Sequence, residues 1–195
     1  MGPGKTEQIT DTELRIPPEP GNRSCTRCRV SVVIPTLNEE RAIGRVLGGI
    51  PDPVWRMGEV VVVDASRDRT PLIAGSLGAR VIPAARRGKG HQVKLGMDAA
   101  RGDILVMMDG DGEHPPEYIP LLIAALGRNC PVITGVFRLA GVSFTGSPLT
   151  GYRCMCREAW EMLRPESGNF LFEAEMNVRM GERGVCYREV PIPFH

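Results

Sequence analysis

The chain has 195 residues, of which 42% are hydrophobic and 24% charged, a composition typical of a folded globular domain. The formal net charge of +1 argues against nucleic acid as a partner, and no apolar run approaches the roughly 20 residues of a membrane-spanning helix. Residues 1–29 are polar, contain closely spaced prolines and lack the apolar core of a signal peptide. We therefore expect a flexible N-terminal arm over residues 1–29, one folded domain over residues 30–195, and a cytoplasmic location.

The six cysteines bear on the redox compartment and on zinc binding. Without a secretion signal, free thiols are the expected state. Cys25 and Cys28 have the spacing of a zinc-binding pair, and Cys154 with Cys156 is the available second pair. That second pair is a poor match to zinc-binding spacing and falls in a helical pattern. Free thiols are therefore the preferred interpretation, and a shared zinc site is the alternative.

Short apolar runs alternate with helix-like segments along the rest of the chain. Buried strands are predicted over residues 30–35, 59–63, 80–82, 104–108, 132–135 and 185–190. Helices are predicted over residues 38–50, from residue 70 onward, and over 88–100, 116–126, 153–163 and 173–183. Because the strands are apolar throughout and alternate with helices, we expect an α/β fold with a mainly parallel central sheet and helices on both faces. A mixed sheet stays open for the strands after residue 108.

The clearest chemical signal is a set of three acidic side chains, spaced two residues apart, directly after the strand predicted at 104–108. Asp109, Asp111 and Glu113 would lie at the carboxyl end of that strand, where open α/β sheets bind ligands. Crowded carboxylates repel one another unless a cation lies among them, and oxygen ligands suit Mg²⁺ or Mn²⁺. The same residues would also suit an acidic surface turn, because Asp-Gly is a common turn pair.

Polar loops follow three other predicted strands. Glu39 follows the first strand, Asp64 the second, and Arg87 with Lys89 the third. Carboxylates accept hydrogen bonds from a base or a ribose, whereas Arg87 and Lys89 beside two glycines suit a diphosphate. The chain has no Walker loop, and no Gly-x-Gly-x-x-Gly follows a strand. Four such loops at one sheet edge predict a crevice for a nucleoside diphosphate and a divalent metal.

These motifs in combination resemble the family 2 glycosyltransferases, which have the Rossmann-like GT-A fold in a single domain. They are most similar to the dolichol-phosphate or polyprenyl-phosphate mannose or glucose synthase branch. The resemblance runs from about residue 30 to residue 194. The segments that carry it are 31–39, 62–70, 88–90, 100–104, 108–111, 114–117, 172–176 and 189–192. The segment His-Pro-Pro-Glu at 114–117 is the one that points to this branch.

The resemblance implies which residues bind the nucleotide-sugar donor. Pro35, Glu39 and Asp64 would contact the nucleoside of a donor of the GDP-mannose or UDP-glucose type. Lys89 would lie near the diphosphate, and Asp109 would also belong to the donor-binding residues.

The resemblance also implies the metal ligands and the acceptor site. Asp109 and Asp111 would form the D-x-D pair that holds Mg²⁺ or Mn²⁺, with Glu113 as a third ligand. Arg138 matches the position at which the family binds the acceptor phosphate, so Asp109, Asp111 and Arg138 would be the catalytic residues. In this branch a polyprenyl (dolichyl) phosphate attacks the anomeric carbon of the hexose with inversion. A phosphate is itself a nucleophile and needs no protein base, and a lipid acceptor requires transient contact with the membrane face.

The acceptor side departs from the family pattern. Only residues 139–149 separate Arg138 from the segment 150–153, where relatives have a longer stretch, and Ser147 replaces the usual Asp. The C-terminal extension of relatives is absent after His195. Two further functions therefore stay open: transfer to another, smaller acceptor, and a non-catalytic nucleotide-sugar-binding subunit that needs a partner chain.

Three further side chains have both a functional and a structural interpretation. Glu173 and Glu175 lie in the first turn of the last predicted helix, where acids favour the helix dipole, although both could also bind an acceptor. His114 is expected to shape the loop before Pro115 rather than to bind the metal.

Overall fold

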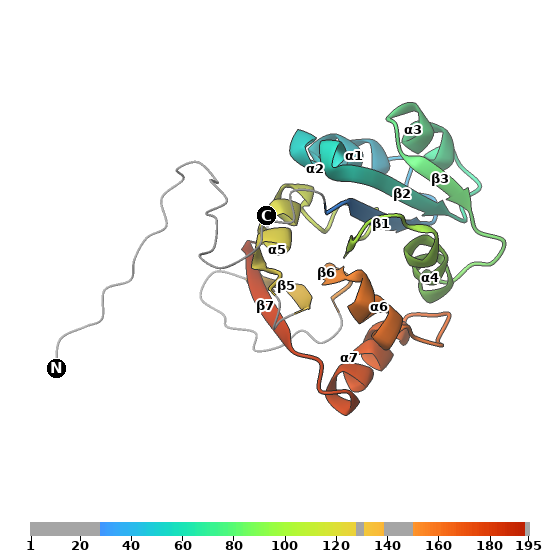
Figure 1. Cartoon of the computed structure of the whole chain (residues 1–195). Helices are drawn as coiled ribbons and strands as arrows, with labels where there is room; N and C mark the ends of the chain where they lie inside the picture. Colours follow the sequence, from blue (N-terminus) through green and yellow to red (C-terminus); the bar gives the residue numbers. More distant parts are fainter. Residues whose placement is uncertain (1–27, 128–130, 139–149, 194–195) are drawn as a thin grey trace.

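The computed structural model describes residues 28–127, 131–138 and 150–193 of the chain (Figure 1). Nearly all of the predicted arm over residues 1–29, and the whole segment 139–149 predicted as a shortened acceptor region, lie outside the described residues, so both stay predictions. Within the described ranges, no helix combines the length and the apolar character that are needed to cross a bilayer.

One sheet of seven strands runs through the domain in the order β3-β2-β1-β4-β6-β5-β7. The strands are β1 (Val30–Thr36), β2 (Gly58–Asp64), β3 (Arg80–Pro83), β4 (Ile104–Met107), β5 (Val132–Arg138), β6 (Arg153–Cys156) and β7 (Tyr187–Pro193). β1 pairs in parallel with β2 and β4, β2 pairs with β3, and β5 pairs with β7, whereas β6 runs antiparallel to both of its neighbours. The predicted α/β class and the mainly parallel sheet are confirmed, and the sheet is mixed at β6.

Helices cover both faces of this sheet, as predicted (Figure 1). They are α1 (Ile43–Gly49), α2 (Asp52–Met57), α3 (Thr70–Ser76), α4 (Lys89–Ala99), the 3₁₀ turn η1 (Pro116–Tyr118), α5 (Ile119–Ala125), α6 (Arg157–Leu163) and α7 (Phe172–Glu182). Side chains of α1, α2, α3 and α5 share one core with Val32 and Ile34 of β1. Side chains of α4, α6 and α7 share the other core with Val33. Successive strand residues point to opposite faces, so a strand covered on both sides must be apolar throughout.

The predicted helix over residues 153–163 is wrong in its first turn. Residues 153–156 form β6, and α6 begins only at Arg157. The short strand fills the sheet between β4 and β5 and buries Cys154 in one core and Met155 in the other. Pairing with two neighbouring strands therefore outweighs the helical spacing of its apolar residues.

The helix predicted over residues 38–50 is shorter than expected. Asn38 has a φ of 61°, in the left-handed region, and the regular helix begins only at Ile43. The chain therefore makes a turn after β1, and the acidic residues 39 and 40 belong to this turn rather than to the helix. Helix α2, between α1 and β2, has no counterpart in the sequence-based prediction.

The cysteines agree with the expectation in part. Cys154 and Cys156 are free thiols, and Cys154 is fully buried. Cys28, however, is disulfide-bonded, so the expectation of a free thiol is wrong at that position. A disulfide sulfur is not the thiolate that zinc requires, so a zinc site shared through Cys28 has no support.

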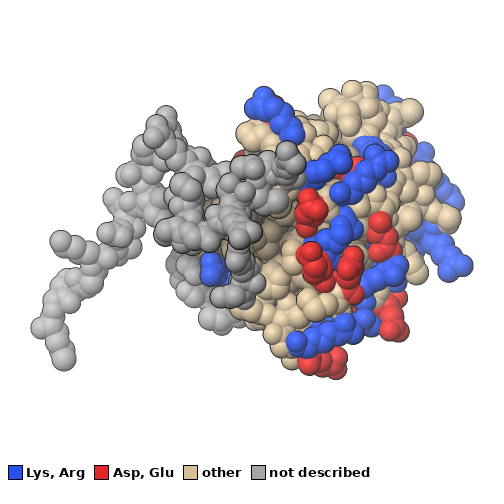
Figure 2. All heavy atoms as spheres, viewed as in Figure 1, with Lys and Arg blue, Asp and Glu red and all other residues tan. Residues whose placement is uncertain are grey.

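The surface carries charges of both signs. On the face viewed in Figure 2, Lys and Arg side chains alternate with Asp and Glu, and no extended patch of one sign covers that face. This pattern agrees with the net charge of +1, and such a face has no field that would attract a polyanion.

Candidate functional site

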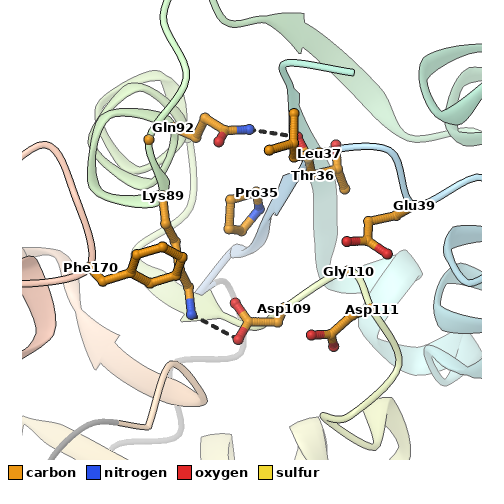
Figure 3. Close-up of a pocket in the computed structure, with 11 residues that line it drawn as sticks. Pro35, Thr36, Leu37, Glu39, Lys89, Gln92, Asp109, Gly110, Asp111 and Phe170 are labelled. Carbon is orange, nitrogen blue, oxygen red and sulfur yellow. Dashed lines mark hydrogen bonds and ion pairs between the residues drawn. The ribbon is translucent and has the colours of Figure 1, made fainter. Parts of the chain in front are cut away.

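A cavity of about 360 Å³ opens at the carboxyl ends of β1 and β4, beside the start of α4 (Figure 3). Its lining residues come from four separate segments: Pro35, Thr36, Leu37, Glu39, Gly88, Lys89, Gln92, Asp109, Gly110, Asp111 and Phe170. Five of the residues predicted for the site therefore line one cavity: Pro35, Glu39, Lys89, Asp109 and Asp111. This is the sheet edge at which parallel α/β folds bind ligands.

Lys89 lies between two carboxylates in the cavity wall. Its Nζ donates a hydrogen bond to Asp109 Oδ2 at 2.8 Å and lies 3.0 Å from Glu173 Oε1. Burial lowers the pKa of Lys89, but the negative charges of Asp109 and Glu173 outweigh it and hold that pKa above its usual value. The lysine therefore stays charged and neutralises part of an otherwise acidic pocket.

Glu173 reaches this group from the first turn of α7. Its side chain is almost fully buried, and burial raises its pKa although Lys89 and Arg153 oppose the shift. The structure thus joins Glu173 to the residues predicted for the site, whereas Glu175 holds a neighbouring loop. The two carboxylate oxygens of Glu175 accept hydrogen bonds from the backbone amides of Glu166 and Ser167, at 2.7 and 2.8 Å.

Gly151 closes the back of this charged group. A Cβ at this position would lie 2.9 Å from Lys89 Nζ, 3.1 Å from Glu173 Oε1 and 3.2 Å from Asp109 Oδ2. The three charged atoms therefore converge on a backbone that has room for them only because residue 151 is glycine. Gly151 lies in the segment 150–153 that resembles the family, but the sequence assigned it no role beside Lys89, from which it is about 60 residues away along the chain.

Glu39, Asp109 and Asp111 form the acidic side of the cavity. Burial raises the pKa of Glu39, and the negative charges of Asp111, Asp68 and Asp109 raise it further. This mutual repulsion is what a bound cation would relieve. Within the ranges that the structure describes, however, no three His, Cys, Asp or Glu side chains already form a metal cage.

Glu113, predicted as a third metal ligand, is exposed and is not among the residues that line the cavity. Its backbone amide donates a hydrogen bond to Asp111 Oδ1 at 2.9 Å, so the loop after Asp111 folds back on that carboxylate. Its role as a ligand stays a prediction.

Asp64 lies at the end of β2, next to Thr36 of β1. Its Oδ1 accepts hydrogen bonds from Thr36 Oγ1 at 2.8 Å and Ser66 Oγ at 2.6 Å, and its Oδ2 accepts one from the Ser66 amide at 3.1 Å. These bonds fix the loop after β2 against the loop after β1. Asp64 is 7% exposed and is not among the residues that line the cavity, so its predicted contact with a nucleoside stays untested.

His114 binds the backbone of Asp109. Its Nδ1 accepts a hydrogen bond from the Asp109 backbone amide at 2.8 Å, and its ring stacks on Tyr152 with centroids 5.1 Å apart. Burial lowers the pKa of His114 despite the nearby Asp109 charge. The ring is therefore neutral at pH 7 and shapes the acidic loop, as the sequence analysis expected.

The start of α4 and the segment before α7 pack closely against each other. The His91 amide donates a hydrogen bond to the Gly168 carbonyl at 3.1 Å, and a Cβ at Gly90 would lie under 3.0 Å from the backbone of Ser167 and Asn169. This close approach brings Phe170 to the cavity rim (Figure 3). Sequence reasoning missed Phe170 and Gln92, because neither belongs to a motif and each reaches the site only through tertiary packing.

Arg138, the predicted acceptor-phosphate residue, ends β5, but its side chain lies outside the described residues. Its backbone pairs with Pro193 of β7. The structure therefore places Arg138 on the half of the sheet beyond β6 and leaves its predicted contact untested.

The chain matches a known protein family. The family model described as "Glycosyl transferase family 2" matches residues 31–186. The chain belongs to glycosyl transferase family 2. The family predicted from the sequence motifs is thereby confirmed.

Two curated relatives from the archaeon Haloferax volcanii are similar over 85% of the chain. One is the low-salt glycan biosynthesis hexosyltransferase Agl6, which is 33% identical over 199 aligned residues, and the match covers 48% of that protein. The other is a dolichyl-phosphate hexose transferase, which is 32% identical over 188 aligned residues, and the match covers 82% of that protein. The chain thus spans about half the length of the first relative. The name of the second relative supports the predicted resemblance to the polyprenyl-phosphate sugar branch.

A solved structure confirms the fold. Glucosyl-3-phosphoglycerate synthase from Mycobacterium tuberculosis, in complex with Mn²⁺, UDP and phosphoglyceric acid, superposes with a TM-score of 0.75 at 26% identity. The match covers 86% of this chain and 69% of that one. The predicted GT-A architecture is therefore correct for the described domain.

Proposed function

We propose that the chain is a metal-dependent, inverting glycosyltransferase that moves a hexose from a nucleotide sugar to a polyprenyl (dolichyl) phosphate. One observation carries the proposal: the cavity at the ends of β1 and β4 brings Glu39, Lys89, Asp109 and Asp111 together. A lysine and several carboxylates in one crevice suit a diphosphate with its metal. The name of the dolichyl-phosphate hexose transferase relative supports the acceptor.

The donor binds across the cavity in this proposal. Pro35 and Glu39 contact the nucleoside together with Asp64, and Lys89 lies near the diphosphate. The polarity of the cavity fits this order, because Glu39 lies away from Lys89 across the pocket (Figure 3). A donor of the GDP-mannose or UDP-glucose type satisfies these groups, and the UDP complex of the structural neighbour favours the uridine form.

The acidic residues fit a divalent metal. Asp109 and Asp111 would hold Mg²⁺ or Mn²⁺, with Glu113 as the proposed third protein ligand. Mg²⁺ is commonly bound through one or two carboxylates plus substrate phosphates, so a cage completed by the donor needs no preformed protein cluster. When bound, the metal neutralises the departing diphosphate. The raised pKa of Glu39, caused by burial and by neighbouring carboxylates, is the electrostatic sign that this pocket favours a cation.

The protein residues have limited chemistry to perform. An oxygen of the acceptor phosphate forms a bond to the anomeric carbon as the bond from that carbon to the diphosphate breaks, with inversion. The acceptor is already anionic, so no protein base is required. Lys89 stabilises the charge that develops on the leaving diphosphate, and Arg138 is the proposed ligand of the acceptor phosphate.

A smaller acceptor is the second candidate. The structural neighbour was solved with phosphoglyceric acid, a small phosphorylated acid, and it has the same fold as this chain. A binding subunit that needs a partner chain is the third candidate. A lipid acceptor additionally implies peripheral contact with the cytoplasmic membrane face.

Calorimetric titration tests the donor site. UDP and GDP are titrated into the full chain with and without Mn²⁺, and into Asp111→Asn, Glu113→Gln and the surface control Asp52→Asn. We expect one nucleotide to bind only with Mn²⁺, and we expect binding to be lost in Asp111→Asn and kept in Asp52→Asn. Weakened metal-dependent binding in Glu113→Gln would support the third ligand. No binding of either nucleotide would contradict the proposal.

A transfer assay with the matching nucleotide sugar then separates the acceptors. Product from dolichyl phosphate supports the main proposal, and product from 3-phosphoglycerate alone supports the smaller acceptor. Nucleotide binding without transfer to either acceptor supports the binding subunit.

A further inference from the structure

Phe170 is unusual among the residues of the cavity. Its side chain is 73% exposed, the highest value among the large exposed hydrophobic side chains that the structure describes, yet it lines the cavity with Lys89 and Asp109. An aromatic ring left in water at the rim of a polar pocket gains stability when a ligand covers it.

The position of this ring is fixed by the backbone of its loop. Glu175 accepts hydrogen bonds from the amides of Glu166 and Ser167, and Gly168 accepts one from the His91 amide on α4. Asn169 Oδ1 accepts a hydrogen bond from the Leu171 amide at 2.9 Å. Every residue from 166 to 169 therefore takes part in a hydrogen bond, and Phe170 follows on a held segment.

The place of the ring within the cavity indicates which part of a ligand it meets. Phe170 lies on the side of Lys89, and Glu39 and Asp111 lie on the other side (Figure 3). In the proposed function the nucleoside lies toward Glu39 and the diphosphate near Lys89. The group beyond the diphosphate, on the side of Phe170, is then the hexose.

A hexose presents two kinds of surface to such a pocket. Its hydroxyl groups donate hydrogen bonds to a carboxylate such as that of Asp109. Its C–H groups form an apolar face that packs on an aromatic ring, which is how aromatic residues provide contact area with a fixed orientation. Phe170 and Asp109 line the same cavity and supply one partner for each kind of surface.

We propose that Phe170 is a platform for the hexose of the donor, and hence a residue that sets sugar specificity. This inference rests on the proposed function, because it requires a nucleotide sugar in the cavity. It deepens that function by assigning a sugar contact to a residue outside every motif of the chain.

The test compares each nucleotide with its sugar conjugate. UDP, UDP-glucose, GDP and GDP-mannose are titrated with Mn²⁺ into the full-length wild type, Phe170→Ala and Phe170→Tyr. For the base that binds, we expect Phe170→Ala to weaken the nucleotide sugar about five- to tenfold, the effect of losing one aromatic contact. The free nucleotide has no hexose to pack on the ring, so its affinity for Phe170→Ala should stay within about twofold of that for wild type, or ~0.4 kcal/mol. Phe170→Tyr keeps the ring face and should restore the affinity for the sugar conjugate.

Leu171 supplies the matched control. It is the next residue, its side chain is 63% exposed, and it is not among the residues that line the cavity. Leu171→Ala should leave both affinities unchanged. Melting temperatures of all variants should stay near that of wild type, because both side chains are exposed.

Four outcomes would overturn the inference. Equal weakening of nucleotide and nucleotide sugar in Phe170→Ala would place the ring at the base, and unchanged binding of both would remove it from the donor site. If donor binding is unchanged but both Phe170→Ala and Leu171→Ala raise the KM for dolichyl phosphate, Phe170 is a lipid contact. Failure of wild type to bind any nucleotide would contradict the proposed function itself, and this inference with it.

Discussion

At the scale of single residues, the charge balance of the cavity depends on Lys89. Its ammonium group is the cation between Asp109 and Glu173, at 2.8 and 3.0 Å. A metal bound by Asp109 would therefore compete with the lysine for the same carboxylate. Glu173 is then the carboxylate that keeps Lys89 in place, which gives a structural reason for a buried acid beside the site.

Gly151→Ala tests how closely this group is packed. The added Cβ would lie within 3.2 Å of a charged atom of Lys89, Glu173 and Asp109, so the three must separate. We expect metal-dependent nucleotide binding to weaken by about tenfold or more, the effect of losing roughly 1.4 kcal/mol. The measurement is titration calorimetry with Mn²⁺ present.

The control for this variant is Gly181→Ala on α7, where a Cβ meets nothing within 4 Å. Replacing a helical glycine by alanine should stabilise the fold by roughly 0.5–1 kcal/mol without changing binding. Wild-type affinity in Gly151→Ala would show that the charged group adapts freely, contrary to our expectation.

Individual site residues were predictable from sequence where they follow a strand within a few positions. Asp109, Lys89 and Glu39 are of this kind, because the carboxyl ends of parallel strands meet at one edge. Glu173 stayed ambiguous, because an acid in a first helical turn has a sufficient explanation in the helix dipole. Phe170 was not predictable, because its role depends on a loop that packs against α4 from about 80 residues away.

At the scale of elements, α4 is joined to the sheet by a buried amide. Gln92 Nε2 donates hydrogen bonds to the carbonyl oxygens of Thr36 at 2.7 Å and Val63 at 2.8 Å, at the ends of β1 and β2. The side chain is 3% exposed, so these bonds form away from water. The helix that carries Lys89 thus has a fixed position relative to both strand ends.

Gln92→Glu should disrupt this junction more than Gln92→Met does. A carboxylate would face two carbonyl oxygens without a hydrogen to donate, at a cost of roughly 2–4 kcal/mol at pH 7. Urea unfolding at pH 7 and at pH 5 measures the effect. The Glu variant should recover part of the loss at pH 5, because a protonated carboxyl can donate one bond. Equal stability of the two variants at pH 7 would contradict the assigned role of the amide.

The loop before α7 depends on Glu175 in the same way. Burial opposes ionisation, but the amides of Glu166 and Ser167 and the charge of Arg179, 2.7 Å away, lower the pKa of Glu175 to about 2. A carboxyl with a lowered folded-state pKa stabilises the fold above its unfolded value of 4.5 and loses that contribution as the pH falls toward 2.

Glu175→Gln should therefore lower stability at pH 7 by roughly 2 kcal/mol, the scale of hydrogen bonds to a charged group. The difference from wild type should shrink steadily between pH 4.5 and pH 2, the window set by the two pKa values of Glu175. Thermal unfolding across this range measures it. A difference that does not vary with pH would mean that the charge of Glu175 contributes nothing.

The sequence analysis missed strand β6, and the reason is physical. Residues 153–156 begin a helical pattern that continues to residue 163, yet they form β6. Without β6, the facing edges of β4 and β5 would be unpaired. Strand formation here is decided by partners 19 to 52 residues away, which a local pattern does not contain. The strands with continuous apolar runs, β1 and β2 above all, were predictable because burial on both faces leaves a local signature.

At the scale of the whole molecule, the sheet consists of two parts. The strands β3, β2, β1 and β4 are parallel and supply the cavity, whereas β5 and β7 form a parallel pair on the other side of β6. Of the residues proposed to bind the donor, all but Phe170 lie at or after the ends of strands of the first part, and Arg138 belongs to the second. The two substrates would therefore meet across β6.

Hydrogen exchange should reveal this division. Addition of the binding nucleotide with Mn²⁺ should slow amide exchange at the ends of β1 and β4, at the start of α4 and in the loop over residues 166–171, and leave β7 unchanged. Ligands stabilise the regions they contact and those whose opening must break that contact. Mass spectrometry of peptides from each part measures it. Protection centred on β5 and β7 would place the nucleotide elsewhere.

The order of the strands along the chain has a consequence for biosynthesis. The four parallel strands β1 to β4 are all contained in residues 30–107, and their partners in the sheet lie within that range except at the β4 edge that meets β6. As the chain leaves the ribosome, this part can pair before β6 and β7 are translated. The β4 edge would then stay unpaired until β6, about 50 residues later in the chain, is synthesised. We expect nascent chains arrested before residue 153 to be the ones that require chaperones.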